Sequence, residues 1–321
     1  MAPKNNTAKN TANQSTRRLF LFAGYDRMGI VDDTALHYLS ALSELGDIVF
    51  IMDNEATPDE LDKLKTIPNL LHARAIRHGE YDFGSYKRAY MWAHENDILS
   101  KYDWVYLAND SVYGPFADIS GILCDLESRG VDLTGMIDFQ NKPTPIQVQS
   151  WFVGMSKRVA TSDFIYDFMS SIVPQDTKQL VVLKYEVGLS QTILRHGYQM
   201  STYISGQDGE ICHSIYETPI AMLKLGLPFV KKTALQNLSG LQYLYPYTSE
   251  LMVDQIHNNA LRLGIPFVKS VAPPYKKCFR LTLFSVPLFT VYRQHHANHY
   301  WTCYKGYLFD FIPVGKIFRQ N

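Results

Sequence analysis

Short apolar runs alternate with amphipathic segments through the first two thirds of the chain, and this order restricts the fold more than any other feature. Runs with the character of buried strands cover residues 18–24, 47–52 and 104–108, and segments with helical spacing follow them. Residues 147–155 predict a further strand, of mixed character. Buried strands separated by helices are typical of a parallel sheet that is covered on both faces. The sequence therefore predicts an α/β fold with a mixed, mostly parallel sheet sandwiched by helices.

The residues that follow the predicted strands are the first candidates for a binding site. In parallel sheets of this class, ligands bind in the crevice outside the carboxyl ends of the strands. We therefore expect the functional residues to come mainly from four segments: Gly24-Tyr25-Asp26, Asp53-Asn54, Asn109-Asp110-Ser111 and Asp138.

The charge and cysteine content argue against several classes of protein. The 31 Lys and Arg residues balance the 31 Asp and Glu residues, so no charge excess favours nucleic acid as a partner. The four cysteines form no C-x-x-C pair, which disfavours a zinc site, and they are too few for a disulfide framework in 321 residues. We therefore expect a protein of the reducing cytoplasm.

The two ends of the chain differ in character from its centre. Residues 1–16 are rich in Asn, Thr, Ala and Lys and contain no apolar run, so they predict a disordered tail rather than a signal peptide. Residues 17–270 are expected to form the main domain. Residues 271–321 form an extension with two aromatic runs between basic flanks. Such an extension suits a membrane surface, and the alternative is a β-hairpin packed on the main domain. No apolar run reaches the ~18 residues of a transmembrane helix.

Three stretches carry a resemblance to a known family. The first runs over residues 22–45 and contains Phe-Ala-Gly-Tyr-Asp, Val-Asp-Asp and Leu-His-Tyr-Leu. The second joins Asp-Phe-Gly-Ser-Tyr-Lys at 82–87 to Asn-Asp-Ser-Val-Tyr-Gly-Pro at 109–115. The third is Tyr-Glu-Val-Gly-Leu-Ser-Gln at 185–191, followed by Pro-Phe-Val-Lys-Lys at 228–232. In this order and spacing they resemble the bacterial rhamnan synthesis protein F family.

The resemblance implies a glycosyltransferase with the Rossmann-like fold called GT-A. Such an enzyme would transfer a sugar, often rhamnose, from a nucleotide-diphosphate donor. The acceptor would be a lipid-linked or growing surface polysaccharide of the O-antigen, rhamnan or lipopolysaccharide type, and the resemblance favours inversion at the anomeric carbon. The alternative is a non-catalytic relative that binds nucleotide-sugar or glycan for a larger assembly enzyme.

Asp110 is the candidate for the diphosphate and its metal. An enzyme of this kind must stabilise the leaving diphosphate, by a divalent cation or by fixed donors and cations. GT-A enzymes commonly carry Asp-x-Asp after this strand, whereas this chain has Asn109, Asp110 and Ser111. The resemblance therefore implies one carboxylate that holds Mg²⁺ or Mn²⁺ with water and diphosphate oxygens. The alternative is that Asp110 only forms a turn.

Four further residues are candidates for contacts with the donor. The resemblance implies that Asp82 bonds the base or ribose, that Gly84 permits close backbone approach, and that Lys87 meets phosphate. The helix predicted directly after Asp82 favours anions at its N-terminus, but Asp82 could also be a simple helix cap. Asp26 follows the first strand, at the sheet edge that meets the base in GT-A folds.

An inverting transfer requires a general base near the acceptor hydroxyl. Glu186 is the first candidate because it begins a predicted helix where related transferases carry an acidic pair, and Asp138 is the second candidate. The alternative for Glu186 is an acidic residue that complements the helix dipole.

Three basic residues late in the chain are weaker candidates. His213 could reach the metal or the diphosphate, although a single His is more often structural. Lys231 and Lys232 could bind phosphate or a lipid headgroup, and a solvated basic pair is the alternative.

Overall fold

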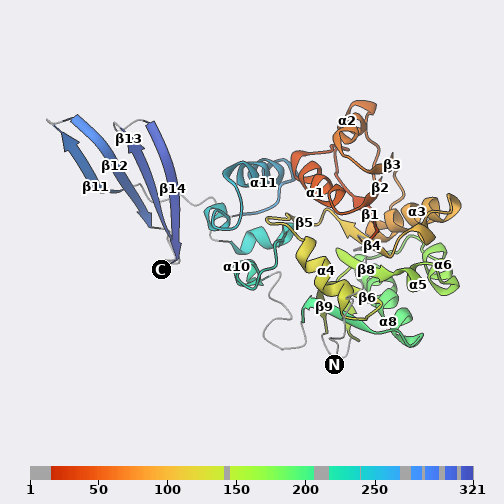
Figure 1. The fold of residues 1–321 in the computed structure, drawn as a ribbon. Coiled ribbons are helices and arrows are strands. Elements are labelled where there is room, and N and C mark those ends of the chain that lie inside the picture. Colours follow the sequence, from red (N-terminus) through yellow and green to blue (C-terminus); the bar gives the residue numbers. More distant parts are fainter. Residues whose placement is uncertain are drawn as a thin grey trace, which may run out of the picture.

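Eight strands within the described part of the chain form one mixed sheet, which lies among the helices α1 to α8 in Figure 1. The structure, a computed structural model, describes residues 16–140, 145–205, 217–238 and 240–267, and strands within 276–320. The strands of the central sheet are β1 (Arg18–Gly24), β2 (Asp47–Met52), β3 (Leu70–Ala75), β4 (Trp104–Asn109), β6 (Leu133–Phe139), β7 (Gln147–Val148), β8 (Phe152–Ser156) and β9 (Met200–Ile204).

The sheet has the order β3-β2-β1-β4-β8-β6-β7, with β9 paired to β6. Strands β3, β2, β1 and β4 are parallel neighbours, and β6 and β9 are also parallel. Strand β8 is antiparallel to both β4 and β6. The predicted α/β fold with a mixed, mostly parallel sheet is confirmed.

Strand β1 shows why its sequence is buried on both faces. Leu19 and Leu21 point into the core layer that α3, α6 and α8 cover, whereas Phe20 and Phe22 point into the layer that α1 and α4 cover. All four side chains are fully buried, and each contributes about 1.5–3 kcal/mol by leaving water. An uninterrupted apolar run is therefore what this position requires.

The helices begin and end where their local sequences direct. Asp32 caps α1 by accepting the N–H of Ala35, and Ser249 caps α11 by accepting the N–H of Met252. Gly264 ends α11 in the left-handed region, which costs glycine little. The helices are α1 (Asp33–Ser43), α2 (Pro58–Asp62), α3 (Tyr81–Glu95), α4 (Ser120–Ser128), α5 (Lys157–Ala160), α6 (Asp163–Ser170), α7 (Lys178–Val181), α8 (Gly188–Arg195), α10 (Pro219–Lys224) and α11 (Glu250–Leu263).

A third core cluster joins α10 and α11 to a two-stranded sheet of β5 (Val112–Tyr113) and β10 (Val230–Lys231). The short helices that connect the larger elements are η1 (Lys63–Thr66), η2 (Leu99–Lys101), η3 (Val182–Val187), η4 (Lys232–Asn237) and η5 (Leu241–Leu244). Strand β10 is paired with residues more than a hundred positions earlier, and this pairing brings the end of the domain to the end of β4.

Three local predictions differ from the structure. Residues 147–155, predicted as one strand, form β7 and β8 with a turn between them. Asp82 lies inside the first turn of α3 rather than before it. Glu186 was expected to begin a helix, but α7, η3 and α8 run on without a break from Lys178. The helix begins earlier because Thr177 caps it by accepting the N–H of Leu180.

The described C-terminal residues form a four-stranded antiparallel sheet of β11 (Lys276–Leu283), β12 (Val286–His295), β13 (Trp301–Leu308) and β14 (Ile312–Gln320). This is a larger unit than the hairpin that was the alternative for residues 271–321.

The predicted tail, residues 1–16, lies outside the described residues except for Thr16. Among the residues described, none of the helices has the length and apolar character needed to cross a membrane.

Candidate active site

A cavity of about 650 Å³ lies at the carboxyl ends of β1, β2 and β4. Its wall includes the residues that follow all three strands, the first turn of α3, the segment η3 and the residues at β10. This is the edge at which the sequence predicts a site. Six of the candidate residues named from the sequence line the cavity: Asp82, Asp110, Ser111, Glu186, Lys231 and Lys232.

The turn after β4 is organised by Asn109 rather than by Asp110. The Asn109 Oδ1 accepts the Ser111 N–H at 3.0 Å, and its Nδ2 donates to Asp82 Oδ2 at 2.8 Å. Asp110 instead accepts the N–H of Tyr25 at 3.1 Å, from the loop after β1. The carboxylate of Asp110 is therefore not the group that makes the turn, and the carboxylate of Asp82 faces Asn109 rather than capping α3.

Two consecutive lysines reach this turn from the short sheet. Strand β10 pairs with β5 so that Lys231 lies opposite Val112. The Lys231 Nζ lies 2.9 Å from Ser111 Oγ, and the Lys232 Nζ lies 3.9 Å from Asp110 Oδ2. Both lysines line the cavity. The alternative of a solvated pair does not describe Lys231, whose side chain is buried.

Burial shifts the pKa values of Asp82, Asp110 and Lys231. It raises the pKa of Asp82 to about 6, and the nearby charge of Asp110 acts in the same direction. Burial also raises the pKa of Asp110, against the effect of Lys232, and lowers the pKa of Lys231 to about 8. Shifts of this size, produced by burial and by specific charge partners inside a cavity, are a physical indication of a functional site.

Glu186, which also lines the cavity, is held by β7 and by the turn between β7 and β8. Its Oε1 accepts from Gln147 Nε2 at 2.8 Å, and its Oε2 accepts from Ser150 Oγ. The Ser150 carbonyl in turn accepts from the Tyr86 hydroxyl at 2.9 Å. Glu186 lies in η3, a π-helical segment, and such segments occur frequently at functional sites.

Other predicted site residues lie outside the cavity lining. The Lys87 Nζ donates to the carbonyl of Ile172 at 2.7 Å, and the Asp138 Oδ2 accepts from the Thr202 hydroxyl at 2.9 Å. Gly84 allows the Glu80 side chain to pack closely against α3, because a Cβ at position 84 would clash with that side chain. His213 lies outside the described residues.

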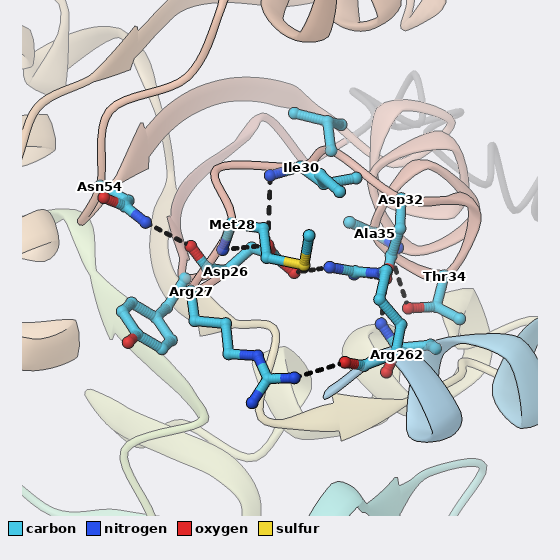
Figure 2. Close-up of polar contacts among 12 residues, drawn as sticks. Asp26, Arg27, Met28, Ile30, Asp32, Thr34, Ala35, Asn54 and Arg262 are labelled. Carbon is cyan, nitrogen blue, oxygen red and sulfur yellow. Dashed lines mark hydrogen bonds and ion pairs between the residues drawn. The ribbon is translucent and has the colours of Figure 1, made fainter. Parts of the chain in front are cut away.

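Asp26, predicted to contact the base, is engaged in shaping the loop between β1 and α1 (Figure 2). Its Oδ1 accepts the N–H groups of Met28 at 2.8 Å and Ile30 at 3.2 Å. Its Oδ2 forms an ion pair with Arg262 Nη1 at 2.6 Å, and Arg262 Nη2 donates to Asp32 Oδ2 at 2.8 Å. Arg262 thereby fastens the end of α11 to the loop that presents Tyr25 to Asp110.

Replacing Arg262 with glutamine is expected to lower the free energy of unfolding by about 2 kcal/mol. The substitution removes the guanidinium that pairs with Asp26 and Asp32, and the loss should be below the ~3–5 kcal/mol of a fully buried pair, since the Arg262 side chain is 22% exposed. Urea unfolding measures the change. Arg158→Gln is the matched control, because its side chain is 68% exposed although it pairs with Asp132. We expect that control to lose much less stability, because a solvent-exposed ion pair contributes little; equal losses in both variants would contradict the role given to Arg262.

Sequence comparison identifies the family of the chain. Residues 48–275, more than half of its length, match the family described as rhamnan synthesis protein F. The chain belongs to the rhamnan synthesis protein F family. This confirms the predicted resemblance, and membership of a family named for rhamnan synthesis supports sugar transfer as the general class of activity. None of the curated proteins compared matches this chain.

Solved structures with some similarity to this chain include fungal sugar transferases. The mannosyltransferase Ktr4p from S. cerevisiae is 10% identical, with a TM-score of 0.33 over 50% of this chain and 61% of that chain. Core-mannan synthase A from Aspergillus fumigatus, in an Mn/GDP form, is 9% identical, with a TM-score of 0.31 over 59% of this chain and 71% of that chain. The chain thus spans less than two thirds of the Ktr4p structure that it matches.

Proposed function

We propose that the protein is a glycosyltransferase that moves a sugar, with rhamnose as the first candidate, from a nucleotide-diphosphate donor to a growing surface polysaccharide. The observation that carries this proposal is the cavity at the strand ends, which has Lys231 and Lys232 on one wall and the hydrogen-bonded carboxylate of Glu186 among its other lining residues. A cationic group and a base in one cavity are what transfer from a diphosphate requires.

The donor end of the cavity would hold the diphosphate. Cleavage of the bond between the anomeric carbon and the diphosphate leaves negative charge on an oxygen, and fixed cations stabilise that charge most effectively where water is excluded. Lys178 and Arg77 line the same cavity as the two lysines of β10. Tyr25, which follows β1 and is 52% exposed, offers a ring against which a base could stack.

Glu186 would act on the acceptor. As the acceptor hydroxyl attacks the anomeric carbon from the side opposite the diphosphate, its proton would pass to the Glu186 carboxylate. The new bond then forms on the opposite face of the sugar, so the transfer inverts the anomeric configuration. The hydrogen bonds from Gln147 and Ser150 fix the orientation of the carboxylate, as a positioned general base requires.

The alternative function is donor binding without turnover, in the service of a larger assembly enzyme. One observation favours it: the turn after β4 carries a single carboxylate, that of Asp110, which already faces Lys232. The two functions differ in a single measurable property, which is release of the diphosphate from the sugar.

The direct test is to incubate the protein with dTDP-, UDP- and GDP-linked sugars, dTDP-rhamnose among them, and a polysaccharide acceptor, and to measure diphosphate release. Acceptor-dependent release from one donor is the expected result. Binding of a donor with no release in the presence of acceptor would support the alternative.

We further propose that the C-terminal sheet contacts an anionic membrane surface. Register places Phe279 opposite Val291 and Leu281 opposite Phe289, so one face carries apolar side chains. Phe279 and Leu281 are each 52% exposed. Residues 276–320 contain seven basic residues against Asp310 as the one acidic residue. Exposed apolar side chains on a basic element are suited to the headgroup region of anionic lipids.

The membrane proposal predicts that the protein sediments with vesicles of phosphatidylcholine and phosphatidylglycerol but not with phosphatidylcholine alone. Replacing Phe279 and Leu281 together with serine should weaken binding about tenfold or more, since each side chain would bury apolar area in the bilayer. Leu225→Ser is the matched control, because Leu225 is also exposed, at 51%, but lies after α10. Equal binding by the two variants would contradict this role for the sheet.

A further inference from the structure

The two ammonium groups at the end of β4 are held in place by their surroundings. The Lys231 Nζ lies 5.5 Å from the centre of the Trp151 ring, and the Lys232 Nζ lies 5.5 Å from the centre of the Tyr113 ring. Each therefore gains a cation–π contact in addition to its polar partner in the turn. Both rings belong to buried residues, so the positions of the two charges are fixed by the core of the domain.

The oxygen atoms of this turn do not fit a resident divalent cation. Mg²⁺ takes six oxygen ligands in near-octahedral geometry, of which a protein usually supplies one or two carboxylates while water and phosphate oxygens supply the rest. Asp110 is the one carboxylate of the turn, and its Oδ2 already accepts the Tyr25 N–H and lies 3.9 Å from the Lys232 Nζ. The Asn109 Oδ1 accepts from Ser111 N and Oγ. A doubly charged ion at Asp110 would also be repelled by the ammonium of Lys232.

The rest of the described chain adds no alternative ion site. Within residues 16–140, 145–205, 217–238 and 240–267 and the C-terminal strands, no three His, Cys, Asp or Glu side chains gather in a way that could hold a metal. Asp110, where Mg²⁺ or Mn²⁺ was expected to bind, therefore already faces a cation of the protein, the ammonium group of Lys232.

We propose that Lys231 and Lys232 bind the donor diphosphate and stabilise it as the leaving group, so that transfer requires no divalent cation. The inference rests on the proposed function. The bond between the anomeric carbon and the diphosphate oxygen breaks with its electron pair on that oxygen. The bond from the acceptor oxygen forms, and the acceptor proton goes to Glu186. The two lysines stay protonated throughout and donate hydrogen bonds to the diphosphate. Their two positive charges take the place of a divalent ion.

The test is calorimetric titration of the full chain with dTDP, UDP and GDP, in excess EDTA and again in Mn²⁺. We expect the diphosphate that binds to have the same Kd, within about twofold, under both conditions. Lys231→Met and Lys232→Met should each weaken binding about 10- to 100-fold, as expected for the loss of a charged hydrogen bond. Lys157→Met, a substitution at an exposed lysine that begins α5 outside the cavity, is the control and should bind as the wild type does.

The failure of this inference is distinguishable from the failure of the proposed function. Binding that requires Mn²⁺ and disappears in EDTA would overturn the inference and leave a donor site in place. No binding of any of the three diphosphates under either condition would contradict the donor site itself. Unchanged binding by both lysine variants would assign the diphosphate to other groups.

The pH dependence of binding provides a second readout that a merely structural role would not produce. Because burial lowers the pKa of Lys231 to about 8, the free protein carries this charge below pH 8 and loses it above. Asp82, Glu186 and Lys178 are the charged groups that act on it. Asp82, with a pKa of about 6, is already ionised in this range. The Kd should therefore rise by up to about tenfold per pH unit above pH 8. Lys231→Arg should remove that rise, and a rise that persists in this variant would contradict the assignment.

Discussion

The Glu186→Gln protein is expected to turn over donor about 10²- to 10⁴-fold more slowly than the wild type, the usual contribution of a general base. Glutamine keeps the size of the side chain: its amide oxygen can still accept from Gln147, and its amide N–H can donate to the Ser150 hydroxyl oxygen, so both groups that hold Glu186 keep a partner. It cannot accept the proton of the acceptor hydroxyl. The loss should therefore appear in kcat, while the Kd of the donor diphosphate changes less than about threefold.

Glu95→Gln is the matched control for this experiment, because Glu95 is an exposed residue at the end of α3. Its turnover should equal that of the wild type. If Glu186→Gln also retains full turnover, Glu186 is not the base, and Asp138 becomes the next candidate. A rise in Kd with unchanged kcat would instead assign Glu186 to donor binding.

Substitution of Asp110 should produce the second large effect, a fall in kcat/KM of about 10²- to 10³-fold. Asp110 lies between two parts of the site: its Oδ2 accepts the N–H of Tyr25 and faces the ammonium of Lys232. Asp110→Asn removes the charge beside Lys232 but keeps an oxygen for Tyr25, whereas Asp110→Ala removes both. We expect the alanine variant to lose more activity than the asparagine variant.

Two controls make the Asp110 result interpretable. Asp59→Asn removes a carboxylate from the exposed surface of α2 and should leave kcat/KM unchanged. Circular dichroism of both Asp110 variants should match that of the wild type, since the substitutions lie at a cavity wall. Normal kcat/KM in the folded alanine variant would show that the proposed donor site is in the wrong place.

The central sheet could be predicted from the sequence because its signals are local. The apolar runs of β1, β2 and β4 are buried on both faces, and the residues after them form the cavity edge. The same reasoning identified Asp110 and Ser111 as site residues, whereas Asp82 and Glu186 came from the family resemblance, and all four line one cavity.

The remaining features of the site depend on contacts between distant segments. Lys231 reaches Ser111 across 120 positions, through the pairing of β10 with β5. The Pro-Phe-Val-Lys-Lys stretch was visible as part of the resemblance, but nothing near it in sequence distinguishes a buried lysine from a solvated one. The contact between Arg262 and Asp26 spans an even larger separation. Such contacts depend on how distant strands pair and how helices pack, and the spacing of residues within a short stretch of sequence does not predict them.

Glu186 illustrates a different limit of structure prediction from the sequence. Its identity as a candidate came from the resemblance, and its expected place at the beginning of a helix was wrong, because Thr177 begins the helix at an earlier turn. The groups that hold it, Gln147 and Ser150, lie within a segment predicted as one strand that the structure divides into two. The residues at the turn, 149–151, include no Gly or Pro, and the hydrophobic pattern did not predict a turn there.

The measurement that tests the central claim most directly is calorimetric titration of the folded protein with dTDP, UDP and GDP. The account predicts that one of the three binds with a stoichiometry of one and a Kd on the order of 1 µM to 1 mM, the range of enzyme substrates. The corresponding nucleotide sugar should compete for the same site. Absence of binding by all three, in a sample whose circular dichroism shows it to be folded, would contradict the assignment of the cavity as a donor site.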